Sequence, residues 1–179
     1  MLMQDTKTII DRSQSTWELI DKVNPRLKRD FGFCISIEGF DDLQGELGSV
    51  LDFDLDELID LNKSSMIWTV YLSDIIGHLN VSIERYKNML DIYEYLDSIS
   101  VKDPDEFQIN APKYKIDSRN IPIAIQIVTE RKNDLTAFVK ILKVLATSLD
   151  AYKDYASANY YKTSSLIASS RCRAYNNAF

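Results

Sequence analysis

The chain has 179 residues, of which 45% are hydrophobic, so it can bury the core of one domain of ordinary size. It contains only 5 Gly and 4 Pro, and this scarcity of turn residues disfavours an all-β sandwich or barrel. It has neither a run of about 20 apolar residues that would span a bilayer nor a signal-peptide pattern. We therefore expect a cytoplasmic protein, located in the host cytoplasm if it is viral.

The formal net charge of −6 conceals a strong asymmetry along the chain. Residues 1–110 carry 10 Lys and Arg against 22 Asp and Glu, whereas residues 111–179 carry 11 against 5. A chain with an acidic N-terminal part and a basic C-terminal part can attract an anionic partner with its C-terminal part only. It can also attract another copy of itself.

The first predicted element is a short helix over residues 15–23, because Ser15 or Thr16 can cap it and apolar residues recur along one face. Asn24 and Pro25 are expected to stop this helix. Apolar residues then alternate with small or polar ones over residues 31–37, which is the period of a β-strand.

Residues 30–62 form the most biased stretch, with ten acidic residues and no Lys or Arg. Asp54 followed three residues later by Glu57 resembles a capping box that opens a short helix over residues 55–61. The stretch is either an ordinary solvated acidic face or a surface that mimics nucleic acid or docks a basic partner. For the second interpretation, the candidate partner-binding residues are Asp41, Asp42, Asp52, Asp54 and Asp56.

Residues 64–100 are predicted to form a long helix, because apolar residues recur with alternating spacings of four and three. Additional apolar neighbours widen this heptad seam beyond that of a two-stranded coiled coil, which favours a bundle. The seam consists of Leu72, Ile76, Leu79, Ile83, Tyr86, Leu90 and Tyr93, and the neighbours that widen it are Ile75, Met89 and Leu96.

Residues 101–120 are polar and contain two prolines, so they are predicted to connect two helices. Asn120 and Pro122 mark the start of the next helix, which continues at least to Ala158. Its seam again has spacings of three and four, and apolar residues left unburied on the two helices would favour self-association. This second seam consists of Leu135, Phe138, Leu142, Leu145, Leu149, Tyr152 and Ala156.

The expected fold is therefore mainly α. Residues 63–179 are predicted to form a long antiparallel helical hairpin or bundle with its connection at 101–120. They follow a small acidic region at residues 1–62 that contains short helices and has room for one short strand pair.

No set of residues suggests catalysis or metal binding. His78 is the single histidine, with Asp74 as its one acidic helical neighbour, and this is too little for a metal site. A calcium loop starting at Asp52 fails because it has Glu57 where Gly is needed and Lys63 where Glu is needed. Because nucleophile elbows, phosphate-binding glycine loops and dinucleotide fingerprints do not occur, we expect a protein that is not an enzyme and uses no cofactor or metal.

The basic C-terminal part offers a candidate nucleic-acid site. Lysines and arginines can contact phosphates, while neighbouring tyrosines can stack on unpaired bases. The alternative is that these lysines only keep the outer face of an amphipathic helix soluble. The candidate residues are Lys140, Lys143, Lys153, Tyr160, Tyr161, Lys162, Arg171 and Arg173.

The order of elements over residues 64–175 resembles that of the phage UvsY-type recombination mediators. The resemblance is carried by a long helix, the polar connection APKYKID at 111–117, and a second long helix containing LDAYK at 149–153. It implies a helical phage protein that forms a ring-like oligomer, binds single-stranded DNA and helps to load a recombinase onto strands coated with single-strand-binding protein.

Two functions follow as hypotheses. The first is an oligomeric, non-enzymatic accessory protein of DNA recombination or replication that binds single-stranded DNA and recombination proteins. The alternative is a protein-binding or structural assembly protein, such as a virion component or an inhibitor, that engages a basic partner through its acidic surface at residues 30–62.

Overall fold

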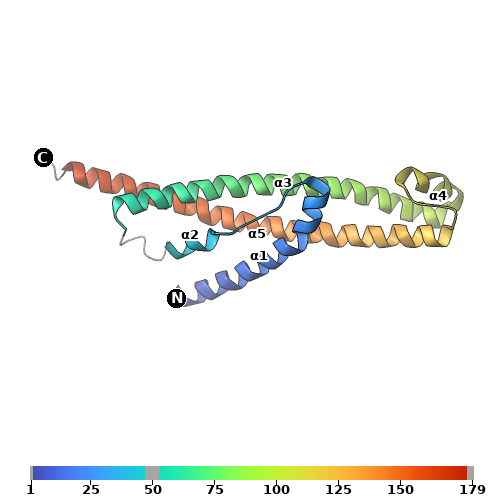
Figure 1. The fold of residues 1–179 in the computed structure, drawn as a ribbon, viewed down its shortest axis with the longest axis horizontal. Helices are drawn as coiled ribbons and strands as arrows, with labels where there is room; N and C mark the ends of the chain where they lie inside the picture. The colour runs from blue at the N-terminus through green and yellow to red at the C-terminus, as the bar shows by residue number, and fades with distance from the viewer. Residues whose placement is uncertain (1, 47–52, 177–179) are drawn as a thin grey trace. The chain divides into compact units, whose positions relative to one another are not determined.

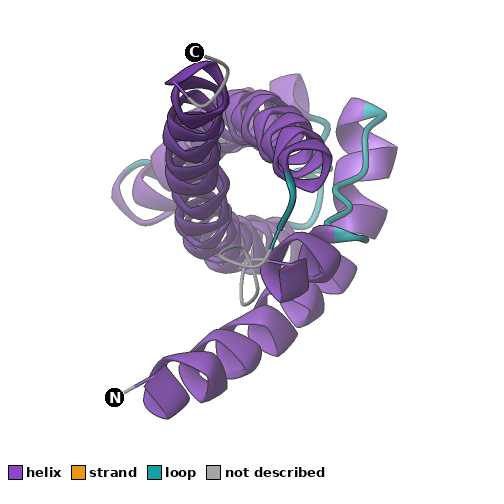
Figure 2. Cartoon of the chain, turned by 90° about the vertical axis from the view of Figure 1, so that its left-hand side faces the viewer, coloured by secondary structure: helices purple, strands orange, loops and turns teal. Residues whose placement is uncertain are grey.

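The computed structural model of the chain describes the backbone of residues 2–46 and 53–176, and the side chains of residues 15–43 and 53–172. Its elements are helices, traced in chain order in Figure 1. Figure 2 shows helices and loops, and no strand, in this described part of the chain. The helices are α1 (Leu2–Phe31), α2 (Phe40–Glu46), α3 (Leu55–Lys102), α4 (Pro104–Asn110) and α5 (Ile121–Asn176), with a 3₁₀ turn η2 (Ala111–Tyr114) between α4 and α5.

The prediction that the first helix ends before Pro25 is wrong, because α1 continues through this proline to Phe31. An interior proline removes one helical hydrogen bond and bends the helix, and α1 changes direction along its length in Figure 1. Burial on both sides of the proline accounts for the continuation, since Ile20, Val23 and Leu27 are all buried. The helix instead ends at Gly32, whose positive φ of 77° lets its N–H reach the carbonyl of Lys28 at 3.0 Å.

The alternating segment after α1 is extended, but the structure describes no strand there. The alternation is reflected in burial: Ile35 and Ile37 are buried, whereas Ser36 between them is exposed. In place of a neighbouring strand, the side chain of Asn24 holds this segment, accepting from the N–H of Ile35 and donating to its carbonyl oxygen, each at 2.8 Å. The pattern therefore gave the correct buried face without a β-ladder.

The predicted capping box at the start of α3 is confirmed. The Asp54 carboxylate accepts the N–H of Glu57 at 2.9 Å, and the Glu57 carboxylate accepts the N–H of Asp54 at 2.8 Å. The helix that it opens is not short, however, because α3 runs without a break to Lys102. The sequence-based boundary at residue 62 thus lies inside one helix.

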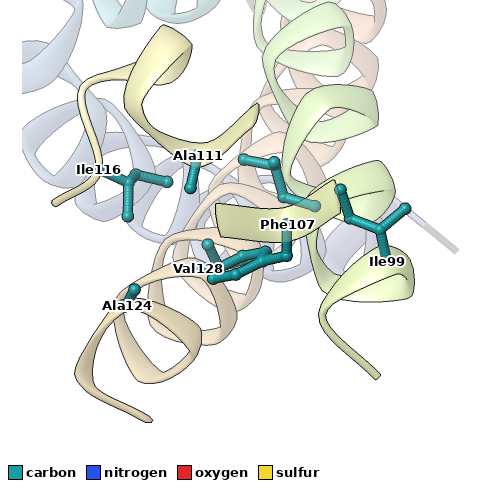
Figure 3. Packing of buried hydrophobic residues seen from close by; sticks show 7 residues of the cluster. Ile99, Phe107, Ala111, Ile116, Ala124 and Val128 are labelled. Atoms are coloured by element: carbon teal, nitrogen blue, oxygen red, sulfur yellow. The ribbon is translucent and has the colours of Figure 1, made fainter. Parts of the chain in front are cut away.

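Residues 101–120 are a connection with helical structure of its own. Asp103 caps α4 by accepting the N–H of Glu106 at 3.0 Å, and Pro104 occupies the first turn, where no N–H is needed. Phe107 is fully buried, and Figure 3 shows side chains from α3, α4, η2 and α5 gathered around it. The residues of this cluster are Leu96, Ile99, Phe107, Ala111, Ile116, Ala124 and Val128.

The chain divides into two compact units. Unit 1 consists of residues 1–78 and 145–179, and unit 2 of residues 79–144. Unit 1 carries 11 Lys and Arg against 17 Asp and Glu, whereas unit 2 carries 10 of each. The whole excess of negative charge therefore belongs to unit 1.

Within each unit, α3 and α5 run antiparallel, as predicted. In unit 2 the rings of Tyr86 and Phe138 are 5.2 Å apart, and the Thr129 hydroxyl donates to the Asp97 carboxylate at 3.1 Å. Later residues of α3 thus contact earlier residues of α5. In unit 1, Asn62 donates to the Tyr160 carbonyl at 2.9 Å. Every residue of the second seam is buried, as are Leu72, Leu79, Ile83 and Tyr86 of the first.

Candidate protein-docking surface on α3

One face of α3 in unit 1 exposes large apolar side chains. Met66, Ile67 and Val70 lie within five residues of each other, and their exposed fractions are 54%, 66% and 61%. Three such side chains on adjacent turns of one helix leave a continuous apolar area in water, which in soluble proteins commonly marks an interaction site.

A groove opens beside this face. It has a volume of about 200 Å³ and is lined by Ile67, Trp68 and Tyr71 of α3 together with Ser36 and Glu38 of the extended segment. The Tyr71 hydroxyl donates to the carbonyl of Ser36 at 2.8 Å, so it fixes the segment along the helix.

Aromatic contacts hold the floor of the groove in place. The Trp68 ring meets the Tyr71 ring edge to face at 5.6 Å and the Phe40 ring at 5.2 Å. Phe40 is fully buried and also meets Tyr152 of α5 at 4.8 Å. Each edge-to-face pair of this kind adds roughly 0.5–1.5 kcal/mol of stability beyond simple burial. Because these contacts fix the rings before any partner arrives, the groove is a preorganised binding surface.

Two carboxylates flank the apolar face along α3, and Lys63 lies between one of them and Ile67. Asp60 and Asp74 stand seven residues before and after Ile67, which places both on its side of α3 about two turns away. Glu38 lines the groove itself. Asp60 pairs with Lys63 at 3.0 Å and Asp74 with His78 at 3.7 Å, and all four side chains are exposed. Such exposed pairs are weak and exchange readily for another cation.

The predicted partner-binding acids are placed differently from one another. Asp41 and Asp42 are exposed in the first turn of α2, directly after the groove segment. Asp54 is occupied by capping α3, because its carboxylate accepts the N–H groups of Asp56 and Glu57. Asp56 is exposed in the first turn of α3, and Asp52 lies outside the described residues.

The predicted nucleic-acid residues fall into both units. Lys140 and Lys143 are exposed in unit 2, whereas the others belong to unit 1. Lys153 pairs with Asp150, and this hydrogen bond raises the pKa of the Lys153 ammonium above its ordinary value. The side chain of Arg173 lies outside the described residues.

The remaining candidates do not share one face of α5. Lys162 and Arg171 are both exposed, but nine residues separate them, which is two and a half turns and places them on opposite sides of the helix. The rings of Tyr160 and Tyr161 lie 5.4 Å apart, edge to face, and Tyr161 is 69% exposed.

Arg171 has a basic neighbour that the sequence reasoning missed. Together with Lys63 it lines a cavity of about 360 Å³ between the first turns of α3 and the last turns of α5. Lys63 ends the lysine-free stretch, and its closeness to Arg171 follows from the antiparallel pairing that also joins Asn62 to Ser164 at 2.8 Å. The sequence could have revealed that Lys63 lies near Arg171 only through the register in which α3 and α5 pair.

In the described part of the chain, no group of three or more His, Cys, Asp or Glu side chains is arranged to hold a metal ion. His78 has the Phe33 ring at 5.4 Å and Asp74 as neighbours. No helix among the described residues is long and apolar enough to cross a membrane.

Comparisons with known proteins identify no family for this chain. No family model matches the chain, and the searches of curated proteins and of solved structures gave no significant match.

Proposed function

We propose that the protein is a non-enzymatic binding protein whose α3 face in unit 1 docks a basic, amphipathic segment of a partner protein. The observation that carries this proposal is the exposed apolar face of Met66, Ile67 and Val70 beside a preorganised aromatic groove, with exposed carboxylates about two turns to either side along α3. This proposal refines the alternative hypothesis of the sequence analysis, because the acidic region acts together with an apolar surface.

Charge selects the kind of occupant. Unit 1 has six more acidic than basic side chains, and Glu38, Asp41, Asp42, Asp60 and Asp74 are exposed around or near the groove. A partner helix with one apolar face and flanking Lys or Arg would satisfy both the apolar area and the carboxylates. The carboxylates would speed association and select against acidic partners, and the apolar contact would supply most of the affinity.

A direct test uses a fluorescently labelled amphipathic helical peptide built from leucine and lysine. We expect it to bind the full chain in anisotropy titrations, and we expect Ile67→Ser to weaken the binding by roughly tenfold or more, because one apolar anchor is worth about 1.5–3 kcal/mol when buried. The matched control is Val101→Ser, which alters another exposed apolar residue of α3, 83% exposed and far along the sequence in unit 2.

Two outcomes would contradict the proposal. One is equal binding by a peptide in which glutamate replaces lysine, since the carboxylates would then select nothing. The other is light scattering that shows an oligomer dispersed by Ile67→Ser in the absence of peptide, since a second copy would then occupy the face.

Single-stranded DNA binding within an oligomer is a second candidate function, supported by the cavity that Lys63 and Arg171 line together and by the exposed ring of Tyr161. Two cations can hold phosphates along a strand while the tyrosine stacks on a base. This candidate site differs from the sequence-based set, because it includes Lys63 and leaves out Lys153.

The second candidate is tested by anisotropy with a labelled single-stranded oligonucleotide at two salt concentrations. Replacing both Lys63 and Arg171 by Gln should weaken binding. It should also flatten the dependence of the binding constant on salt concentration by the amount expected for the loss of about two phosphate contacts. The matched control replaces Lys22 and Lys28, two exposed lysines of α1. Equal losses in both double variants would show a non-specific charge effect and exclude the site.

A further inference from the structure

A second cavity lies entirely within unit 2, and the proposed docking function does not use it. Its volume is about 200 Å³, and its lining combines two lysines, two tyrosines and two aliphatic side chains with no acid. Met89, Ile92 and Tyr93 come from α3, and the remaining lining residues, Lys113, Tyr114 and Lys115, come from η2 and its end.

The lysines of this cavity have no carboxylate partner in the described part of the chain. Lys113 donates to the side-chain oxygen of Asn110 at 2.8 Å, a neutral acceptor. Along α3 the nearest acids are Asp91 and Glu94. At about 100° per residue, both point away from the side of the helix that carries Met89 and Tyr93. Two ammonium groups therefore stand at one opening without a direct ion pair. The nearby Glu106 carboxylate of α4 accepts instead from the Tyr95 hydroxyl at 2.6 Å, and Asp117 pairs with Arg119.

The backbone at Lys115 is unusual. Its φ of 62° and ψ of 36° lie in the left-handed region, and among the described residues it is the one non-glycine with a positive φ. Glycine would adopt this conformation without steric cost. Neither its own N–H, which bonds to the Pro112 carbonyl at 3.0 Å, nor the next N–H, from Ile116 to Ala111 at 3.1 Å, requires a lysine side chain. A left-handed residue commonly ends a helix, and here η2 ends with a lysine at a position where glycine would cost least.

The aromatic wall is also held in place. The Tyr93 hydroxyl accepts a hydrogen bond from the Arg131 guanidinium at 3.1 Å, and the guanidinium carbon lies 5.9 Å from the centre of the Tyr93 ring. Arg131 thus adds a third positive charge behind the ring. Tyr114, 37% exposed, forms part of the opposite lining.

We infer that this cavity binds a nucleotide, with its phosphate at Lys113 and Lys115 and its base against Tyr93 and Tyr114. A volume of about 200 Å³ is below the range of a drug-sized ligand pocket, so it suits one ring system with its phosphate outside. The same chemistry is offered by a free mononucleotide and by the phosphorylated end of a single strand.

The test is calorimetric titration of the full chain with adenosine monophosphate, with adenosine and with inorganic phosphate. The nucleotide should bind at least tenfold more tightly than either part alone, because only the whole molecule engages both the lysines and the rings. A phosphorylated short oligodeoxynucleotide separates the two sources: tighter binding than the mononucleotide identifies a strand end, and equal binding identifies a free nucleotide. Both results support the site.

Variants separate a binding role from a structural one. Lys115→Gly relieves the positive φ and removes the ammonium, so it should leave the melting temperature unchanged or raised while weakening nucleotide binding by roughly tenfold. Lys113→Gln should weaken binding similarly, whereas Lys102→Gln, an exposed lysine outside the cavity, should not. The inference is overturned if the mononucleotide does not bind at millimolar concentration, if phosphate alone binds equally well, or if neither cavity variant alters its affinity.

Discussion

At the scale of single residues, Asn24 has a structural role that is out of proportion to its size. Its amide group makes both hydrogen bonds of the Ile35 backbone at 2.8 Å, and the Ile35 side chain is buried. The Asn24 amide therefore pairs the backbone N–H and carbonyl of Ile35, which a neighbouring strand would pair in a β-sheet. The docking groove depends on it indirectly, because the segment also carries Ser36 and Glu38.

Asn24→Ala should lower the free energy of unfolding by about 2 kcal/mol, because it leaves a backbone donor and acceptor unpaired next to a buried side chain. Urea unfolding followed by circular dichroism measures the loss. Asn133→Ala is the matched control, since Asn133 is exposed on α5 and its replacement should change stability by no more than about 0.5 kcal/mol. Equal midpoints for the two variants would show that Asn24 does not hold the segment.

Residue-scale reasoning from sequence could not distinguish exposed from buried apolar positions. Ile67 and Leu72 are equally apolar and lie on the same helix, yet Ile67 is 66% exposed and Leu72 is fully buried. Which face of α3 is covered depends on α5, on Phe40 and on the extended segment, and these are distant in sequence. The candidate docking surface was therefore outside the reach of periodicity alone.

At the scale of elements, α4 turns a polar connection into part of a core. Asp103 ends α3 by donating its N–H to the Ile99 carbonyl at 2.8 Å and begins α4 with its side chain. Phe107 then fills the space between α3 and α5, as Figure 3 shows.

Two variants of the same short helix test this interpretation. Phe107→Ala should cost about 3–5 kcal/mol of stability because it empties a fully buried site. Ile109→Ala, two residues further and 67% exposed, should cost no more than about 0.5 kcal/mol. Thermal melting of both proteins gives the comparison, and similar losses would mean that α4 does not anchor the connection.

The sequence predicted the elements in proportion to the local signals that each one has. The seams of α3 and α5 repeat over many turns, so both helices and their antiparallel pairing within each unit were expected. α4 has a good local signal in Asp103 and Pro104, but a single turn of apolar pattern is too short for periodicity to reveal it. The passage of α1 through Pro25 depends on tertiary burial, which outweighs the local preference of proline to end a helix.

At the scale of the whole molecule, charge is divided unevenly between the two units. Unit 1 has six more acidic than basic side chains, while unit 2 is balanced. Self-repulsion should therefore weaken unit 1 at low ionic strength, and salt should relieve it.

Raising salt from about 0.01 M to about 0.15 M shortens the screening length from about 30 Å to about 8 Å. Amide hydrogen exchange should then slow in the core of unit 1, with a gain in opening free energy on the order of 0.5 kcal/mol, comparable with one exposed ion pair. Amides in the Phe107 cluster of unit 2 serve as the internal reference. A uniform response across both units would contradict this division of charge.

The double role of Asp103 also limits how the chain can be altered. One residue separates α3 from α4, and a residue inserted in α4 ahead of Phe107 would turn this side chain by about 100° away from its cluster. The first part of the connection, residues 101–111, is thus a poor place for a tag, a fluorophore loop or a circular permutation, although its composition is polar. Such additions are better tolerated at positions 117–120, where the chain is irregular and three of the four side chains are exposed.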